Sequence, residues 1–170
     1  YFGIHTVHYM DLVETCGREK LPMGGIVMGA LLTGLFKGGA GRSGERILSK
    51  WAEGLFNRMD SLKFLAYVGG DGFPVLIPVI QCQAAGSGRL AFSPSAYGDE
   101  LAAVPGGAAV AVFGLSLDME DVLVRGTFNG VSRYRGGRLG TVDIEWVYNP
   151  MPPKQGQVYP AVELRPVTNF

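Results

Sequence analysis

Hydrophobic and polar positions follow two different patterns along this chain, and the change falls near residue 60. Before residue 60, apolar side chains recur every three or four positions, which is typical of helices. After residue 60, short apolar runs are separated by glycine-rich turns, which is typical of antiparallel strands. We therefore expect residues 1–60 to form an N-terminal arm and helical extension, and residues 61–170 to form a separate β domain.

The first part of the chain contains four stretches with different patterns. Tyr1–Tyr9 alternates apolar, aromatic and β-branched residues, which predicts a strand or a docking arm. Leu21–Phe36 is apolar over 16 residues, shorter than the roughly 20 that cross a bilayer, and predicts a buried or interfacial helix rather than a membrane span. The sequence KGGAGRSG at Lys37–Gly44 predicts a flexible break, although glycine amides in such a loop can also cradle phosphate. Ser43–Arg58 predicts a helix that is capped by Ser43.

The second part of the chain predicts a series of strands. Leu62–Val68 is the first, and the turn Gly69–Gly72 follows it. Phe73–Gln83 is the second, in which Pro74 and Pro78 call for an edge or a bulge. The later predicted elements are, in order, the strand Arg89–Ser93, the helix Tyr97–Val104, and the strands Ala108–Leu117, Val122–Ser132, Leu139–Tyr148 and Gln157–Leu164. Evenly spaced strands with glycine turns indicate a closed antiparallel barrel.

Composition excludes some functions and favours a partner subunit. The 15 basic and 15 acidic residues cancel, so the chain lacks the clustered positive charge that nucleic acid requires. Charged residues make up only 18% of the chain, against about a quarter in ordinary soluble domains. Part of the surface must then be apolar, and a second subunit is the usual cover for such a surface.

Cysteine and histidine spacing predicts no metal site. Cys16 and Cys82 are far apart and give neither a zinc motif nor a disulfide framework, which fits a reducing cytoplasm. His5 and His8 have the spacing of a helical ligand pair, but no third ligand accompanies them.

One long segment resembles a known family. The sequence FLAYVGGDGFPVLIPVIQCQAAGSGRLAFSP combines an apolar strand, a DG turn, a Gly-aromatic-Pro step, a second strand with proline and a third strand ending in a hydroxyl residue. It is similar to the opening of the pyridoxamine 5′-phosphate oxidase-like, FMN-binding split-barrel family, and the likeness in element order covers roughly residues 61–166. The resemblance implies a mainly β (α+β) fold, a six- to seven-stranded antiparallel split β-barrel with an N-terminal helical extension.

The resemblance also implies a cofactor site. Family members are usually homodimers that hold FMN between subunits and oxidise or reduce a small molecule. The ring commonly lies along the second strand, and the phosphate commonly meets hydroxyls at the end of the third strand. Trp146 lies late in the predicted barrel, where related folds reach toward the partner's flavin, but packing in the core is the favoured interpretation. On this chain the implied cofactor-binding residues are Pro78, Val79, Ile80, Gln81, Ser93 and Ser95.

The chain departs from the family pattern where basic residues commonly open the helix after the third strand. It reads Tyr97-Gly98-Asp99-Glu100 there, and a phosphate dianion needs donors and positive potential. Three interpretations follow. FMN binds with phosphate contacts from elsewhere, for which Arg89, Arg125 and the Lys37–Gly44 loop are candidates; a deazaflavin or haem replaces FMN; or the cofactor has been lost.

Two functions therefore remain open at this point. One is an FMN-dependent oxidoreductase that acts on a small molecule as a cytoplasmic homodimer, with no catalytic side chain identified because the cofactor carries the chemistry. The other is a non-enzymatic ligand-binding or interaction module on the same barrel. Neither involves nucleic acid or a membrane span.

Overall fold

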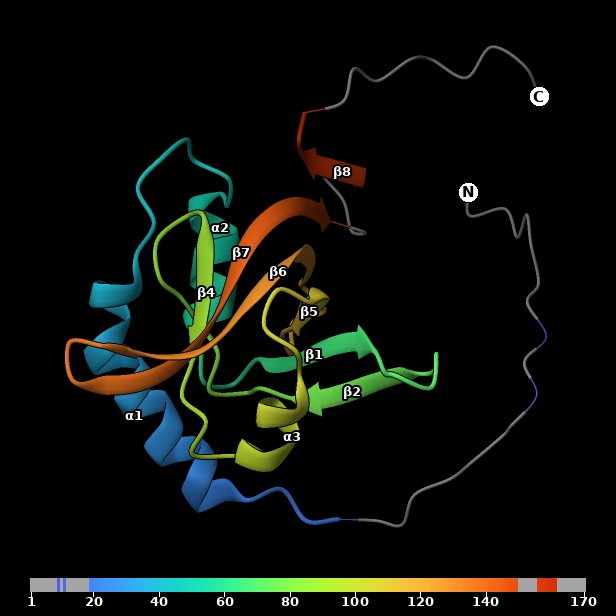
Figure 1. The fold of residues 1–170 in the computed structure, drawn as a ribbon. Coiled ribbons are helices and arrows are strands. Elements are labelled where there is room, and N and C mark those ends of the chain that lie inside the picture. The colour runs from blue at the N-terminus through green and yellow to red at the C-terminus, as the bar shows by residue number, and fades with distance from the viewer. Residues whose placement is uncertain (1–8, 10, 12–18, 150–155, 162–170) are drawn as a thin grey trace.

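A computed structural model describes residues 9, 11, 19–149 and 156–161 of the chain. Two helices come first, α1 (Met23–Ala40) and α2 (Lys50–Asn57), and a third, α3 (Gly98–Ala103), lies between strands (Figure 1). The strands are β1 (Leu62–Val68), β2 (Pro74–Pro78), β3 (Gln83–Ala84), β4 (Arg89–Phe92), β5 (Ala109–Leu115), β6 (Asp121–Tyr134), β7 (Gly137–Asn149) and β8 (Gly156–Tyr159).

The strands form an antiparallel sheet in the order β2-β1-β5-β6-β7-β4-β3, and β8 pairs with the far end of β7. β2 and β3 stand at the two ends of this order, yet residues 79–82 connect them directly in the chain. The sheet therefore rolls until its ends meet at that connection without a strand-to-strand ladder between them. The predicted antiparallel split β-barrel is confirmed, and residues 79–82 lie at the split.

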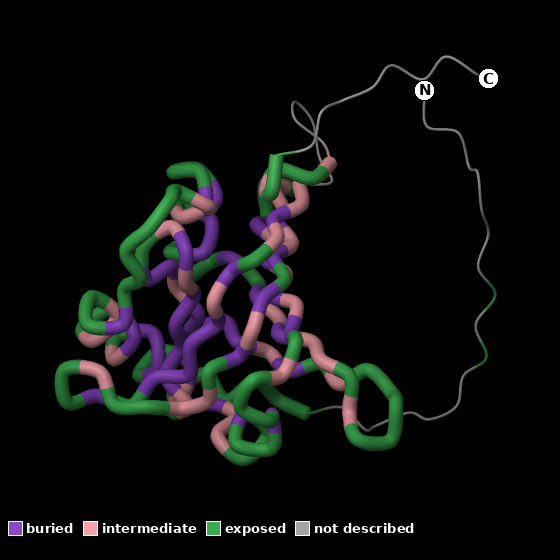
Figure 2. Tube along the Cα trace, turned by 45° about the horizontal axis from the view of Figure 1, so that its top comes forward, coloured by how far each residue is buried: buried purple, intermediate pink, exposed green. Residues whose placement is uncertain are grey.

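The core fills the inside of the rolled sheet. Successive residues of a strand point to opposite faces, so β5 buries Val110 and Val112 while Ala109 is exposed and Ala111 is half-buried. The rings of Phe92 and Phe128 stack with centroids 6.0 Å apart across the interior. Buried positions gather where the strands and helices meet, while the outer loops are exposed (Figure 2).

The long β6–β7 pair bends at a bulge that requires glycine. The register shifts between Arg125 and Gly126, and a Cβ added at Gly126 would lie 1.8 Å from the carbonyl oxygen of Asp143. Only a residue without a side chain permits that approach. The bulge turns the strand within the rolled sheet.

The predicted second strand, Phe73–Gln83, is corrected by the structure. It divides into β2 and β3, because Pro78 has no N–H to donate and the chain leaves the ladder there. The amide of Val79 donates to the carbonyl of Lys63 at 2.8 Å, and the amide of Cys82 closes a turn on the carbonyl of Val79 at 2.7 Å. This division brings the described strands to eight rather than the expected six or seven.

The predicted helix Ser43–Arg58 is also corrected. α2 begins only at Lys50, and Ser49 is its cap, since the Ser49 hydroxyl accepts the amide of Ala52 at 3.2 Å. Helix α1 instead runs on through Lys37–Ala40, which had been predicted as part of a break. The predicted arm Tyr1–Tyr9 and the end of the last predicted strand fall largely outside the described residues.

Both N-terminal helices pack on the barrel. α1 lies against β3, β4, β6 and β7, and α2 places Leu55 and Phe56 in the main core beside Gly114. Among the described helices, α1 has the length and apolar composition of a membrane-crossing segment. The division of the chain at residue 60 into two domains stays a prediction.

Candidate ligand-binding sites

The residues predicted to bind a flavin meet at the split of the barrel. Pro78 ends β2, and Val79, Ile80 and Gln81 form the connection that follows. The Gln81 side-chain amide donates to the carbonyl of Ser93 at 3.0 Å, and the hydroxyls of Ser93 and Ser95 are 3.1 Å apart. The structure therefore brings this predicted set together in space. We call these six residues the cradle.

Helix α1 covers the cradle. The hydroxyl of Thr33 accepts the backbone N–H of Ser93 at 2.8 Å, and the hydroxyl of Ser95 donates to the carbonyl of Gly25 at 3.1 Å. Ile26 packs with Ile80 and Ala96 in a small apolar cluster beside these hydrogen bonds. Hydroxyl and amide groups that a phosphate would use are already bonded to α1.

Two glycines of α1 allow this close contact. A Cβ added at Gly29 would lie 2.7 Å from the Ser95 hydroxyl oxygen and 3.1 Å from Cγ of Gln81. A Cβ added at Gly25 would lie 2.8 Å from the carbonyl oxygen of Ser95. The helix backbone thus rests directly on the cradle, and no ligand fits between them while α1 is in this position.

The surroundings of the cradle are also unfavourable for phosphate. A hollow of about 490 Å³ beside Ser95 is lined by Glu19, Asp99 and Glu100 together with Lys20. Three carboxylates outweigh one ammonium there, so the potential repels a dianion. FMN does not fit the cradle in this arrangement. The cradle does retain one acceptor, because Gln81 Oε1 is buried and has no hydrogen-bond partner among the described residues.

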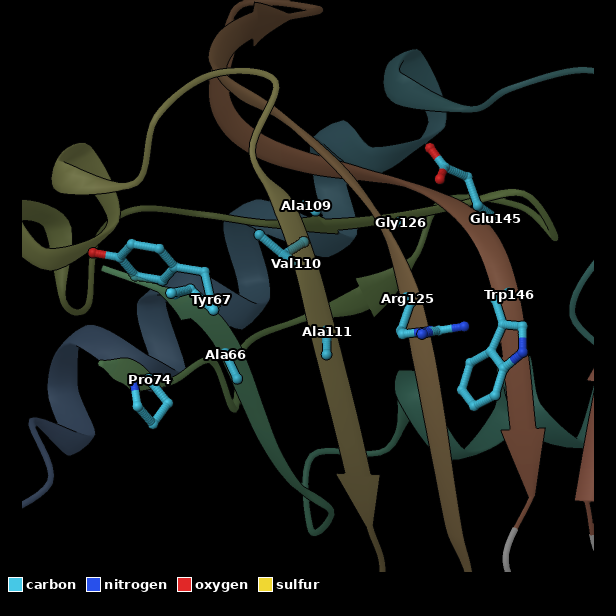
Figure 3. Close-up of a pocket in the computed structure, with 11 residues that line it drawn as sticks. Ala66, Tyr67, Pro74, Ala109, Val110, Ala111, Arg125, Gly126, Glu145 and Trp146 are labelled. Carbon is cyan, nitrogen blue, oxygen red and sulfur yellow. The ribbon is translucent and has the colours of Figure 1, made fainter. Parts of the chain in front are cut away.

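A second candidate site lies on the outer face of the sheet. Five strands place one residue each in register across this face, in the row Leu76, Ala66, Ala111, Arg125 and Trp146. The last four residues of this row line a hollow of about 470 Å³ (Figure 3). Its volume is within the usual range of roughly 300–1,000 Å³ for small-molecule sites. We call it the sheet groove.

The sheet groove has a flat floor and an aromatic wall. Ala66, Ala109 and Ala111 come from β1 and β5, and their methyl groups leave the sheet surface open. The guanidinium of Arg125 lies over the Trp146 ring, 4.1 Å from its centroid (Figure 3). The Trp146 ring also stacks on Tyr148 with centroids 5.5 Å apart. Cation–π contact and stacking hold the indole upright beside the floor.

The charges in the sheet groove suit an anionic planar molecule. Arg125 is exposed and forms no ion pair among the described residues. The carboxylate of Glu145, at the same end, accepts the hydroxyl of Thr127 at 2.6 Å. A flat ring can lie on the alanine floor against Trp146, and an attached phosphate or carboxylate can reach Arg125. The groove residues therefore fit a flavin-type group where the cradle does not.

The sheet groove is part of a larger apolar surface. The neighbouring cross-strand row consists of Pro78, Phe64, Phe113, Leu123 and Tyr148. Leu76, Val68 and Phe73 are exposed near it, at 63%, 68% and 54% of their full accessibility. This is the apolar surface that the low charge content predicted. The sequence analysis named Arg125 and Trp146 separately and did not predict the groove between them. The signal that could have revealed it is the strict alternation in Ala109–Leu115, which puts two alanines on the outer face.

The other predicted phosphate contacts have structural partners. Arg89 donates to the Asp143 carboxylate and, at 3.0 Å, to the carbonyl of Ala40, so it ties the end of α1 to the sheet. Lys37 donates to Asn57 Oδ1 at 2.8 Å, and burial lowers its pKa. A hollow of about 420 Å³ at the end of α1 is lined by Lys37 and Arg42 together with Gly38 and Gly41.

A buried lysine and a buried thiol lie under α2. The Lys63 ammonium donates to the carbonyls of Arg58 and Ile80, and burial lowers its pKa to about 8. Burial raises the pKa of Cys82 to about 12, so its thiol is not a nucleophile. No group of three metal-ligating side chains occurs within the described residues, and Cys16, His5 and His8 lie outside them.

The strand order defines an antiparallel split β-barrel. A crystal structure of HupZ from Group A Streptococcus matches 65% of this chain and 98% of its own, with a TM-score of 0.52 and 12% identity. At that identity the match shows the shared fold.

Two further solved structures have lower scores. A Lactobacillus delbrueckii protein bearing the name "putative pyridoxamine 5′-phosphate oxidase" matches 61% of this chain and 95% of its own, with a TM-score of 0.46 and 18% identity. An F420 reductase matches 57% of this chain and 95% of its own, with a TM-score of 0.41 and 17% identity. No family model matches the sequence, and no curated protein matches it either.

Proposed function

We propose that this protein is a homodimeric split barrel that binds a planar aromatic cofactor of the flavin class in the sheet groove. The observation that carries the proposal is the flat alanine floor with Arg125 and Trp146 at one side. FMN is the first ligand to test, with deazaflavin and haem as the alternatives. A bound flavin would supply hydride transfer to or from a small molecule, while the chain positions the ring.

The second copy is part of this proposal. The sheet groove is open, and the rows around it expose apolar side chains that water would otherwise contact. A partner barrel on this face would bury those side chains and close the groove over its ligand. A cytoplasmic location also belongs to the proposal, and the fully buried free thiol of Cys82 is consistent with it.

We also propose the cradle as a second binding site, which opens on one condition. Its residues are Pro78, Val79, Ile80, Gln81, Ser93 and Ser95. They become available only if α1 moves, because Thr33 and Gly25 bond to Ser93 and Ser95. The unpartnered Gln81 Oε1 would then accept an N–H from a ligand.

A second function is favoured by the position of α1. If the helix stays on the cradle and nothing enters the sheet groove, the barrel is a non-enzymatic binding or interaction module. The observation for it is that α1 uses the donors of the cradle and that Asp99 and Glu100 stand where basic residues would hold a phosphate.

Tryptophan fluorescence tests the first function and locates the ligand. The chain has two tryptophans, so Trp51→Phe leaves Trp146 as the only reporter. FMN, a deazaflavin or haem in the sheet groove should quench that fluorescence at saturation, and Arg125→Leu should weaken binding about tenfold or more if its guanidinium holds the anion. Arg133→Leu, an exposed arginine on the β6–β7 hairpin, is the matched control.

The two functions give different results. Absorbance bands in the purified protein, saturable quenching and an effect of Arg125→Leu alone support the cofactor site in the sheet groove. Binding without quenching of Trp146 would place the ligand elsewhere. No bands and no quenching by all three ligands would leave the interaction module as the function.

A further inference from the structure

Helix α1 is apolar on the side that faces away from the barrel as well as on the side that packs against it. Ile26, Ala30 and Thr33 are buried on the sheet, while large side chains on the opposite side are exposed. Leu31 and Leu35 keep 66% and 69% of their full accessibility, the highest values among the large apolar side chains of the helix. The exposed large side chains of α1 and its approach are Leu21, Met23, Val27, Met28, Leu31 and Leu35.

The spacing of the exposed positions on this side of α1 is symmetric about Leu31. Gly24, Val27, Leu31, Leu35 and Gly38 are all exposed and follow one another at steps of three, four, four and three residues, which keeps them on one stripe. Val27 and Leu35 each stand four positions from Leu31, and Gly24 and Gly38 each stand seven. Leu31 is also at the middle of Met23–Ala40.

The two ends of α1 lie beside opposite charges. At its start, Glu19, Asp99 and Glu100 line one hollow with Lys20. Near its end is the β6–β7 hairpin, in which Arg133, Arg135 and Arg138 are exposed and form no ion pair among the described residues. A Cβ added at Gly39 would lie 2.6 Å from Cγ of Arg135, so this hairpin lies against the end of the helix.

We infer that the exposed stripe of α1 is a docking surface for α1 of a second copy, with the two helices antiparallel about a two-fold axis at Leu31. This surface is distinct from the sheet groove, and the inference does not depend on the proposed function. Around that axis Leu31 of one copy meets Leu31 of the other. Val27 of each copy then meets Leu35 of the other, and Gly24 meets Gly38. Gly24 leaves open space at its end of the stripe, while the guanidinium of Arg135 lies beside Gly38 at the other end.

Charge complementarity favours a second copy over a lipid surface. The antiparallel arrangement sets the acidic end of each copy beside the basic end of the other and aligns the helix dipoles favourably. An anionic bilayer would attract the arginines, but it would repel Glu19, Asp99 and Glu100 beside the start of the helix. Lipid docking prefers basic residues along the whole polar border of the helix.

The size of the stripe sets the strength of the association. A standard interface uses about 20–30 residues on each side. The stripe with its two charged ends is smaller than that, so we expect a dissociation constant in the range of about micromolar, weaker than an obligate dimer. Salt should weaken it further because the charged ends are exposed.

Cross-linking at the axis tests the arrangement. In a Cys16→Ser background, where Cys82 is fully buried, Leu31→Cys should form a disulfide-linked pair under mild oxidation. Leu35→Cys, on the same stripe and equally exposed, should cross-link poorly alone and well when combined with Val27→Cys. A dimer that uses the sheet face alone would give none of these cross-links, so failure of the proposed function and failure of this inference can be told apart.

Sedimentation measures the same contact without cysteines. Leu31→Glu should raise the dissociation constant of this step at least about 30-fold, the loss typical of a central interface residue. The matched control is Leu117→Glu, an exposed leucine in the loop after β5. The inference is wrong if Leu31→Cys fails to cross-link or Leu31→Glu sediments as wild type. It is also wrong if vesicles of phosphatidylcholine with phosphatidylglycerol capture the wild-type chain and the capture is lost in Leu31→Glu, because the stripe would then face a membrane.

Discussion

The hydroxyl of Thr33 accepts the backbone N–H of Ser93 at 2.8 Å, a contact between α1 and the strand end that lies 60 positions further along the chain. Both residues are buried, and the same hydroxyl donates to the carbonyl of Gly29 at 2.7 Å. The N–H at the predicted phosphate position is therefore satisfied by the protein itself. This contact decides how the cradle is used, since a ligand there has to displace it.

Replacing Thr33 by valine should destabilise the fold through this N–H. Valine keeps the shape of threonine but removes the acceptor, so the buried amide of Ser93 loses its partner, which costs about 1–3 kcal/mol. The free energy of unfolding in urea measures the loss. Thr33→Ser keeps the hydroxyl and should recover most of it. Equal stability of Thr33→Val and wild type would show that α1 does not seal the cradle.

Gly29 should tolerate no side chain, whereas Gly24 on the same helix should. A Cβ at Gly29 meets Ser95 and the buried Gln81, while a Cβ at Gly24 meets nothing within 4 Å. Gly29→Leu should therefore cost about 1–3 kcal/mol by overpacking. Gly24→Ala should be neutral or stabilising by up to about 1 kcal/mol, because alanine favours the helix.

Hydrogen exchange shows where Gly29→Leu acts. If α1 lifts from the cradle, amide exchange should accelerate in residues 79–96 and stay unchanged in β1 and β5, which α1 does not pack against. Uniform acceleration across the sheet would instead indicate a general loss of stability, and the helix would not be a separate cover.

The barrel could be predicted from the sequence because each strand has a local sequence pattern. Leu62–Val68 is predicted and observed with the same bounds, since its run of apolar and aromatic residues ends at the Gly69–Gly72 turn. Phe73–Gln83 was predicted too long because its apolar residues continue past Pro78, and the missing N–H of a single proline decided the break. The cap of α2 was misplaced from Ser49 to Ser43 because both serines precede apolar residues at helical spacing.

The candidate sites were harder to predict because they depend on contacts between residues that are far apart in the sequence. The sequence grouped Gln81, Ser93 and Ser95 correctly in space, but the helix that covers them begins at Met23, far earlier in the chain. Its polar contacts with the cradle come from one threonine and one backbone carbonyl, which leave no pattern in an apolar stretch. The sheet groove likewise needs the register that sets Ala66 beside Ala111 and Arg125 beside Trp146.

Filling the floor of the sheet groove should abolish ligand binding there without unfolding the protein. Ala111 is half-buried in the groove, so the ring of Ala111→Phe would occupy the space proposed for the flavin. The stability should change by less than about 0.5 kcal/mol because the added side chain points out of the core. Quenching of Trp146 by FMN should disappear.

Ala102→Phe is the control for this substitution, since Ala102 is exposed on α3 and lies outside the groove. It adds the same apolar area to the surface. Unchanged quenching in Ala111→Phe would contradict the sheet groove as the site, whereas loss of quenching in both variants would point to an indirect effect.

Stability should rise with pH between about 8 and 9 because of Lys63. Burial, opposed by the charges of Cys82 and Asp60, lowers the pKa of this lysine from 10.5 to about 8. Between these values the unfolded chain holds a proton that the folded chain has released, so the free energy of unfolding increases with pH, by at most about 1.4 kcal/mol per pH unit. Below pH 8 the folded protein bears the full cost of burying the charged Lys63 ammonium.

Above pH 9 Cys82 should oppose this rise. Burial raises the pKa of its thiol from 9.0 to about 12, so the unfolded thiol ionises first and stability falls as pH increases. The wild-type profile should therefore climb from pH 8 to 9 and then flatten, while Cys82→Ala should continue to climb toward pH 10.5. Lys63→Met should remove most of the climb between pH 8 and 9, and Lys37, whose pKa burial also lowers, should account for the remainder. Urea unfolding at half-unit pH steps measures all three profiles, and a Lys63→Met profile that still climbs like the wild type would show that Lys63 is not the titrating group.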